Sequence, residues 1–182
     1  MRSFGMNLRA DFGTAKADDR VFRESFDRFY RRELSQVVGL AVVLSGSRTG
    51  AEDLAQEGFL AAYREWDRVS SLDDPGAWVR RVVANKAVSR FRRARSEVKA
   101  LVRIGSPQFV VDQIPEESAY LWREVRRLPQ RQAQAVALRY FDGRSISSIA
   151  EILECSENTV KTHLKRAKAT LVSRIEEEEN HD

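Results

Sequence analysis

A cationic face close to the C-terminal end is the first place where residue types and spacing could do chemistry. At about 3.6 residues per helical turn, residues 157–174 place on one outward face Asn158, Lys161, Thr162, Lys165, Arg166 and Lys168. Long cations reach phosphates or guanine edges, and Asn and Thr bond the edges of bases. The segment holds five Lys or Arg and one acid, whereas a solvating face more often alternates charge. The pattern favours DNA binding over an ordinary two-helix corner with solvated lysines.

The element that must present this face is the second helix of a predicted helix-turn-helix. A short preceding helix, 145–153, has one buried stripe at i, i+3, i+4 and i+7, formed by Ile146, Ile149, Ala150 and Leu153. Ser145 suits the N-cap of this helix, and Ser156 suits the N-cap of the next. Two short amphipathic helices with a turn of about three residues between them form this motif, and the second helix reads DNA.

A second basic helix is predicted over residues 75–95, because Asp74 is a good N-cap and Pro75 fits the first helical position. Residues 78–103 contain nine bases and one acid, which favours nucleic acid. One face gathers Arg81, Asn85, Ser89 and Arg92, with Trp78 at the edge of the apolar arc. An aromatic ring there could stack on an unpaired base while the cations hold the backbone. For Trp78 alone, burial in the core is the favoured alternative.

A third candidate surface lies on the helix predicted over residues 51–66, whose apolar face forms core. Its opposite face carries Asp53, Gln56, Glu57, Leu60 and Arg64. An acidic and amide surface with a leucine in its middle suits protein docking. Single exposed leucines are also common without any function, so this face alone leaves both interpretations open.

Helical spacing recurs along the whole chain, which predicts an all-α fold of two small domains. Helices are expected at 18–44, 51–66, 75–95, 118–127, 129–141, 145–153 and 157–175. The predicted organisation is a flexible extension at 1–17, a domain at 18–95, a linker at 96–117, a domain at 118–176 and an acidic tail at 177–182. The 182 residues are 42% hydrophobic and 32% charged, which is typical of a globular chain.

Composition also excludes several classes of protein. Lys and Arg outnumber Asp and Glu by 31 to 27, although five of the acids lie in the last seven residues, so the body favours a polyanionic partner. One cysteine and two histidines offer neither a disulfide nor a zinc cluster, and we expect no metal and no cofactor. No apolar run approaches the roughly 20 residues of a membrane span. A cytoplasmic location is expected.

Four segments resemble, in order and spacing, the extracytoplasmic-function (ECF, group IV) sigma factors of bacterial RNA polymerase, in the form common in actinobacteria. They are "AEDLAQEGFLAAYREWDRV", "DPGAWVRRVVANKAVSRFRR", "LPQRQAQAVALRYFDG" and "SISSIAEILECSENTVKTHLKRAKATL". The resemblance covers residues 20–174 and implies sigma domain 2 over 18–95 and sigma domain 4 over 118–176. It also implies that the chain has no catalytic residues, because the polymerase performs the reaction.

The resemblance assigns roles to the three surfaces. The second helix would dock on the clamp helices of the largest subunit of core RNA polymerase through Asp53, Gln56, Glu57 and Leu60. The third helix would bind and melt the minus-ten element of promoter DNA through Trp78, Arg81, Asn85, Ser89, Arg92 and Arg93. The loop "SSLDD" before it is a candidate pocket for a flipped base. The minus-35 element would be read as duplex by Asn158, Lys161, Thr162, Lys165 and Arg166. An anti-sigma protein is the expected regulator.

The chain departs from the family pattern at three of its positions. An acidic residue is common where Ser89 stands, and glycine is frequent at the positions of Glu154 and Asn158. These departures put the minus-ten contact of Ser89 in question and suggest strain at Glu154. Asn158 could add a base contact.

Two other classes of protein share part of the pattern. A stand-alone helix-turn-helix regulator would carry a mixed α/β domain upstream, whereas here the upstream half reads as helical and basic. A recombinase or invertase would need a nucleophilic Ser or Tyr on a catalytic fold, and Ser89 and Tyr63 lie in predicted helices without one.

Overall fold

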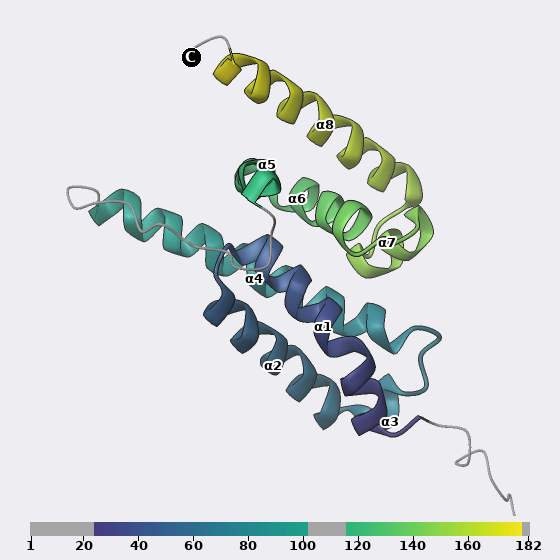
Figure 1. Ribbon diagram of the computed structural model, residues 1–182. Helices are drawn as coiled ribbons and strands as arrows, with labels where there is room; N and C mark the ends of the chain where they lie inside the picture. Colours follow the sequence, from purple (N-terminus) through teal and green to yellow (C-terminus); the bar gives the residue numbers. More distant parts are fainter. Residues whose placement is uncertain (1–23, 102–115, 180–182) are drawn as a thin grey trace, which may run out of the picture.

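The computed structural model describes residues 24–101 and 116–179, and in these residues it contains helices and no strand (Figure 1). The predicted all-α fold is therefore confirmed. The helices are α1 Phe26–Ser45, α2 Arg48–Arg64, α3 Trp66–Val69, α4 Pro75–Leu101, α5 Glu116–Arg127, α6 Gln130–Val136, the π-helical turn η1 Ala137–Phe141, α7 Ile146–Leu153 and α8 Glu157–Glu179. The predicted extension at 1–17 and most of the predicted linker lie outside the described residues.

Local capping explains where the first helices begin. The Ser25 side chain accepts a hydrogen bond from the Arg28 amide at 3.4 Å, and Glu24 and Ser25 are not helical, so the predicted start at residue 18 is wrong. Gly46 ends α1 in the left-handed conformation, at φ 76°. Ser47 then caps α2, which begins three residues before the predicted position.

Three further boundaries differ from those expected from the sequence. The short helix α3 occupies the beginning of the segment that reads as a turn-rich loop. The helix α4 begins at Pro75 as predicted, with the Ala77 amide donating to Asp74 Oδ1 at 2.9 Å, but it continues to Leu101 rather than ending near residue 95. The last helix, α8, runs through the glutamate run to Glu179 instead of ending near residue 175.

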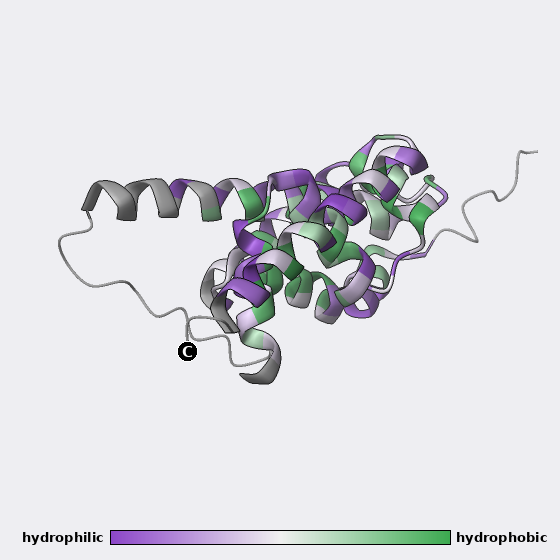
Figure 2. Ribbon diagram, turned by 90° about the horizontal axis from the view of Figure 1, so that it is seen from above, coloured by the Kyte–Doolittle hydropathy of each residue, from purple (hydrophilic) through white to green (hydrophobic). Residues whose placement is uncertain are grey.

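Two groups of helices pack against each other. The N-terminal group, α1–α4, buries Phe29, Leu40, Leu54 and Val83 among its helices, and the C-terminal group, α5–α8, buries residues such as Leu138. Figure 2 shows the apolar residues gathered where helices meet and the polar residues outside. The C-terminal group lies along α1 and α4 (Figure 1). Over 24–101 and 116–179, no helix combines the length and apolarity that crossing a bilayer requires.

Close approach between the two groups depends on a glycine in α1. A Cβ atom at Gly39 would lie 2.6 Å from Cζ of Phe141, so only a hydrogen atom fits between α1 and η1. Nearby, Arg126 of α5 donates a hydrogen bond to the Val43 carbonyl at 3.1 Å. Burial lowers the pKa of Arg126 to about 10, with Arg123 and Arg127 contributing. The two groups therefore meet through specific contacts of backbone and side chains.

Candidate nucleic-acid interface

The helix-turn-helix is present as predicted, with α7 and α8 as its two helices. Ser156 Oγ accepts a hydrogen bond from the Thr159 amide at 3.1 Å and so caps α8. The inner face of α8 buries Val160, Ala167 and Leu171. Its outer face exposes all five residues predicted to read DNA, which are Asn158, Lys161, Thr162, Lys165 and Arg166. These side chains lie at i, i+3, i+4, i+7 and i+8, so one groove could receive them together.

The turn between α7 and α8 contains a strained residue. Glu154 has φ 53° and ψ 51°, and it is the one described non-glycine residue with positive φ. The left-handed conformation costs an L-residue about 1–2 kcal/mol. Its carboxylate forms an ion pair with Arg81 of α4. The strain expected from the sequence at this position is therefore present, together with a contact that the sequence does not indicate.

The predicted single-strand surface of α4 contains an aromatic side chain that is half-buried. The guanidinium carbon of Arg68 lies 5.7 Å from the ring centroid of Trp78, within cation–π distance. Trp78 borders a pocket of about 400 Å³, whose other walls include Leu72, Asp73 and, from α7, Glu151 and Ile152. Trp78 is thus half-buried rather than fully buried or fully exposed. The loop "SSLDD" lines this pocket through Leu72, Asp73 and Asp74.

Two of the other predicted minus-ten residues contact the C-terminal group. Arg81 pairs with Glu154, and Asn85 Oδ1 accepts a hydrogen bond from Gln134 Nε2 at 2.9 Å. Ser89 is exposed and donates its hydroxyl to the Asn85 carbonyl at 2.9 Å. Arg93 is exposed, and the side chain of Arg92 lies outside the described residues. The face of α4 is therefore divided, with its first half covered by α6 and α7.

The predicted docking face on α2 is exposed, with one exception. Asp53 and Gln56 are exposed, and 48% of Leu60 is accessible to solvent. Tyr63, one turn beyond Leu60 and 61% exposed, extends this face although sequence reasoning did not single it out for docking. Two adjacent exposed apolar side chains form a stronger docking signal than one.

Glu57 is the exception on the docking face, because α4 already engages it. Its carboxylate accepts a hydrogen bond from Lys86 Nζ at 2.7 Å and pairs with Arg90. The bond from Lys86 lowers the pKa of Glu57, against a smaller opposing effect of burial, and the charges of Arg90 and Lys86 lower it further. Glu57 therefore links α2 to α4 in addition to facing solvent.

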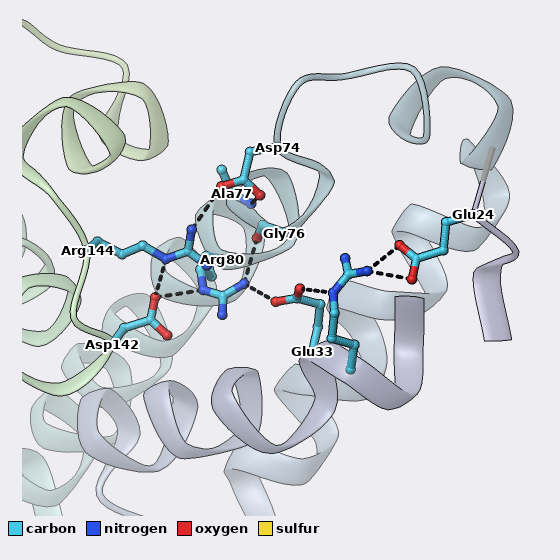
Figure 3. Close-up of polar contacts among 9 residues, drawn as sticks. Glu24, Glu33, Asp74, Gly76, Ala77, Arg80, Asp142 and Arg144 are labelled. Atoms are coloured by element: carbon cyan, nitrogen blue, oxygen red, sulfur yellow. Dashed lines mark hydrogen bonds and ion pairs between the residues drawn. The ribbon is translucent and has the colours of Figure 1, made fainter. Parts of the chain in front are cut away.

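A buried chain of charges joins the two groups of helices (Figure 3). Arg80 of α4 is 2% exposed and donates through Nη1 to Glu33 Oε2 at 2.6 Å and through Nε to Asp142 Oδ2 at 2.7 Å. Arg144 donates to the same Asp142 oxygen at 2.8 Å and to Asp74 Oδ2 at 2.9 Å. Because Asp74 also caps α4, the chain of charges connects the start of α4 to the segment before α7.

Each buried charge in this chain is compensated by its partners. Burial alone would lower the pKa of Arg80, but the bonds and charges of Asp142 and Glu33 outweigh it and raise the pKa. Burial would likewise raise the pKa of Glu33, and the hydrogen bonds from Arg80 and Arg32 reverse that effect and lower it. Both residues are held ionised in the folded chain.

The pH dependence of stability should report on Glu33. Its pKa is lowered on folding from the usual 4.5, so its contribution is fully present above the unfolded pKa and is lost as pH falls through the folded pKa. We expect the free energy of unfolding, measured with urea, to fall on acidification below about pH 4.5. In the variant Glu33→Gln, the free energy of unfolding should already be lower at neutral pH, and it should fall less on acidification. Glu52 is exposed, and the variant Glu52→Gln serves as the control. If the free energy of unfolding fell equally on acidification in Glu33→Gln and in the unsubstituted chain, the role given to Glu33 would be contradicted.

Comparison with known proteins places this geometry in a class. The Sigma-70 region 2 family matches residues 29–97, and the Sigma-70, region 4 family matches residues 118–171. The two regions in this order define a protein of the sigma-70 class. The chain is 31% identical over 169 residues to the ECF RNA polymerase sigma factor SigM of Mycobacterium tuberculosis, covering 92% of this chain and 85% of that protein.

Other relatives agree with this placement. The ECF RNA polymerase sigma factor SigW of Bacillus subtilis is 26% identical, covering 86% of this chain and 89% of its own. The sigma factor RpoE of Bartonella quintana, solved in complex with the anti-sigma factor NepR, has the same fold with a TM-score of 0.66, at 21% identity over 83% of this chain and 96% of that one. The chain belongs to the family of ECF RNA polymerase sigma factors. The predicted family and function are confirmed, and a stand-alone regulator is not favoured.

Proposed function

We propose that this sigma factor uses three separate surfaces of its helices during promoter recognition. The outer face of α8 reads the minus-35 duplex, α4 binds the melted minus-ten strand, and the exposed face of α2 docks on the polymerase clamp helices. The observation that carries the proposal is the division of α8 into a buried apolar face and an exposed face of cations and amides. That division suits a recognition helix in a major groove.

The domain organisation that we propose follows the same surfaces. Sigma domain 2 would comprise residues 18–95 and sigma domain 4 residues 118–176, with a linker at 96–117, an N-terminal extension at 1–17 and an acidic tail at 177–182. The matched family regions, 29–97 and 118–171, support this division.

Melting of the minus-ten element would occur by capture of an extruded base. Extruding one base costs a few kcal/mol of stacking and pairing, which binding of the base offsets. The pocket beside Trp78, bordered by Leu72 and Asp73, supports this role because it adjoins an aromatic face and the cation Arg81. The cations Arg92 and Arg93 and the hydroxyl of Ser89 would follow the strand along α4.

The partners that we propose are core RNA polymerase, promoter DNA and an anti-sigma protein. The last is suggested by the complex of RpoE with NepR. We expect no catalytic activity of the chain itself, since a transcription initiation factor leaves the reaction to the polymerase, and we expect it to act in the cytoplasm.

Transcription with purified components tests the proposed function. The chain should associate with core RNA polymerase on a sizing column and direct run-off transcription from a defined promoter. Mapping the 5′ ends of RNA induced by its overexpression would give both promoter elements and their spacing. A chain that binds promoter duplex tightly alone and never associates with core polymerase would rule the proposal out.

Substitution of Lys165 distinguishes base reading from phosphate contact. We expect Lys165→Ala to weaken promoter binding by the holoenzyme, because the exposed ammonium on α8 neutralises a phosphate or bonds a guanine edge. A phosphate contact would weaken all sequences equally and reduce the slope of log K against log salt by about 0.9. A base contact would instead relax specificity at one minus-35 position. Unchanged affinity and slope would remove Lys165 from the interface.

A further inference from the structure

One acidic residue stands at the beginning of the recognition helix, and none of the three proposed surfaces includes it. Glu157 is the first residue of α8 and is exposed. It is the one acid among residues 157–174, which hold five Lys or Arg. A carboxylate next to DNA is repelled by the phosphates, so an acid at this place is unfavourable unless a hydrogen-bond donor of the DNA compensates it.

The contacts of Glu157 within the chain leave its carboxylate available to such a donor. Ser156 already caps α8 by accepting the Thr159 amide, so the cap does not need Glu157. The carboxylate lies 3.8 Å from Lys161 Nζ, and 54% of the Glu157 side chain and 60% of the Lys161 side chain are exposed. That separation is too long for a hydrogen bond. Within residues 24–101 and 116–179 the carboxylate has this loose ion pair and no hydrogen bond.

The position of Glu157 on α8 brings it to the edges of bases. The N-terminal residues of a recognition helix are those that contact base edges in the major groove. Glu157 directly precedes Asn158 and lies one turn before Lys161, and both of these neighbours belong to the proposed reading face. A groove that receives Asn158 and Lys161 therefore also receives the carboxylate of Glu157.

A carboxylate in the major groove distinguishes the four bases by charge and hydrogen bonding. Cytosine presents its N4 amine, which donates to a carboxylate oxygen. Guanine presents O6 and N7 and thymine presents O4, and these atoms are acceptors that repel a carboxylate. Adenine has a donor at N6, but the acceptor N7 lies beside it. Cytosine is therefore the base that an ionised glutamate fits best.

We infer that Glu157 is a specificity-determining residue, which selects cytosine at one position of the minus-35 element by accepting a hydrogen bond from its N4 amine. Lys161 leaves its loose pair with Glu157 in that complex and binds a phosphate or a guanine edge. Any other base leaves the carboxylate unpaired among phosphates, so the selection acts mainly against the wrong bases. The inference rests on the proposed role of α8 in reading the minus-35 duplex.

Transcription from a promoter library by the reconstituted holoenzyme tests the inference. Core RNA polymerase with the full chain transcribes a promoter, located by mapping RNA 5′ ends, in which the minus-35 element is randomised and each template carries a transcribed barcode. Sequencing the run-off RNA gives the base preference at every minus-35 position. The unsubstituted chain should favour cytosine about tenfold at one position of one strand, because a single side-chain contact to a base discriminates to about this extent.

Three substitutions of Glu157 should change this preference in different directions. Glu157→Gln should move it to adenine, because an amide bonds both N6 and N7 of that base. Glu157→Arg should move it to guanine, because a guanidinium bonds O6 and N7. Glu157→Ala should abolish the preference at this position and leave the other positions unchanged. A change in the preferred base is a result that a purely structural role of Glu157 does not produce.

Two control variants separate base selection from helix stability and from charge. Asp27 lies in the first turn of α1 and pairs with Arg31 four residues later, as Glu157 pairs with Lys161, so Asp27→Asn removes an equivalent acid from a helix outside the reading face. Asp27→Asn should leave every base preference unchanged. Glu151 lines the same pocket as Glu157, and Glu151→Gln should affect all members of the library alike. Circular dichroism checks that each variant retains its helices.

The possible results distinguish this inference from the proposed function. If the unsubstituted chain selects cytosine at no minus-35 position, or if Glu157→Gln and Glu157→Arg affect all sequences alike, the inference is overturned. A minus-35 preference that stays the same in all three Glu157 variants overturns it too, but leaves the proposed role of α8 standing. A holoenzyme that initiates without preference at any minus-35 position rejects the proposed role of α8 itself.

Discussion

Replacing Arg80 with methionine should lower the free energy of unfolding by about 3 kcal/mol, because the substitution leaves buried carboxylates without their cation. Glu33 and Asp142 both accept hydrogen bonds from this guanidinium, and Asp142 is almost completely enclosed. Asp142 keeps its bond from Arg144, which holds the expected loss at the lower end of the range for a broken buried pair. Urea denaturation followed by circular dichroism gives the difference directly.

The adjacent arginine supplies a matched control for Arg80. Arg81→Met removes an ion pair whose partner, Glu154, is largely exposed, and pairs of that kind contribute about 0–1 kcal/mol. Converting Glu33 and Asp142 to their amides in the Arg80→Met background should recover part of the lost stability, since no uncompensated charge remains. Equal losses for Arg80→Met and Arg81→Met would contradict the role assigned to the buried charges.

The second large effect concerns polymerase binding. The double variant Glu57→Ala/Leu60→Ala is expected to weaken affinity for core RNA polymerase about 30-fold, or about 2 kcal/mol, if this face contains the central docking residues. Leu60 is nearly half exposed and Tyr63 beside it more so, although one edge of the Tyr63 ring packs against Phe26 with ring centroids 5.0 Å apart. Fluorescence anisotropy of the labelled chain titrated with core enzyme measures the affinity.

Two controls show whether a loss of polymerase affinity in the double variant comes from the docking face itself. Leu121→Ala removes a comparably exposed leucine, 40% accessible, from α5, and should leave polymerase affinity unchanged. Glu57 also bonds Lys86 and pairs with Arg90, so the double variant should lose up to about 1 kcal/mol of stability, the usual value for exposed pairs. A normal circular dichroism spectrum with unchanged polymerase affinity would refute the docking face.

Helix starts set by one local bond were predictable from the sequence. The side chain of Asp74 caps the amide of Ala77, only three residues further along, and Pro75 fits the first helical position, so α4 begins where these two residues indicate. The outward face of α8 followed from periodicity alone. In α7 periodicity identified Ile149, Ala150 and Leu153 correctly, but Ile146 is only half-buried, and Ile152, which the pattern did not include, is buried. Ser25 was equally capable of capping α1, but nothing in the neighbouring residues distinguished it from an interior position of a longer helix.

Contacts between distant segments were not predictable from the sequence. Arg80 and Arg81 are the same residue type at adjacent positions, yet one is buried with two carboxylates and the other lies on the surface. Their difference is set by Asp142 and Glu154, more than sixty residues away along the chain. A single sequence gives faces of helices, but it does not indicate which faces meet.

The π-helical turn η1, Ala137–Phe141, accommodates one residue more than an α-helical turn would hold at the end of α6. Because the extra residue is absorbed within the turn, the residues before and after it keep nearly the phase of a continuous helix. Phe141 therefore still meets Gly39, and Asp142 still accepts a hydrogen bond from Arg80. The length of this segment can thus differ by one residue without a change in how the two groups of helices meet.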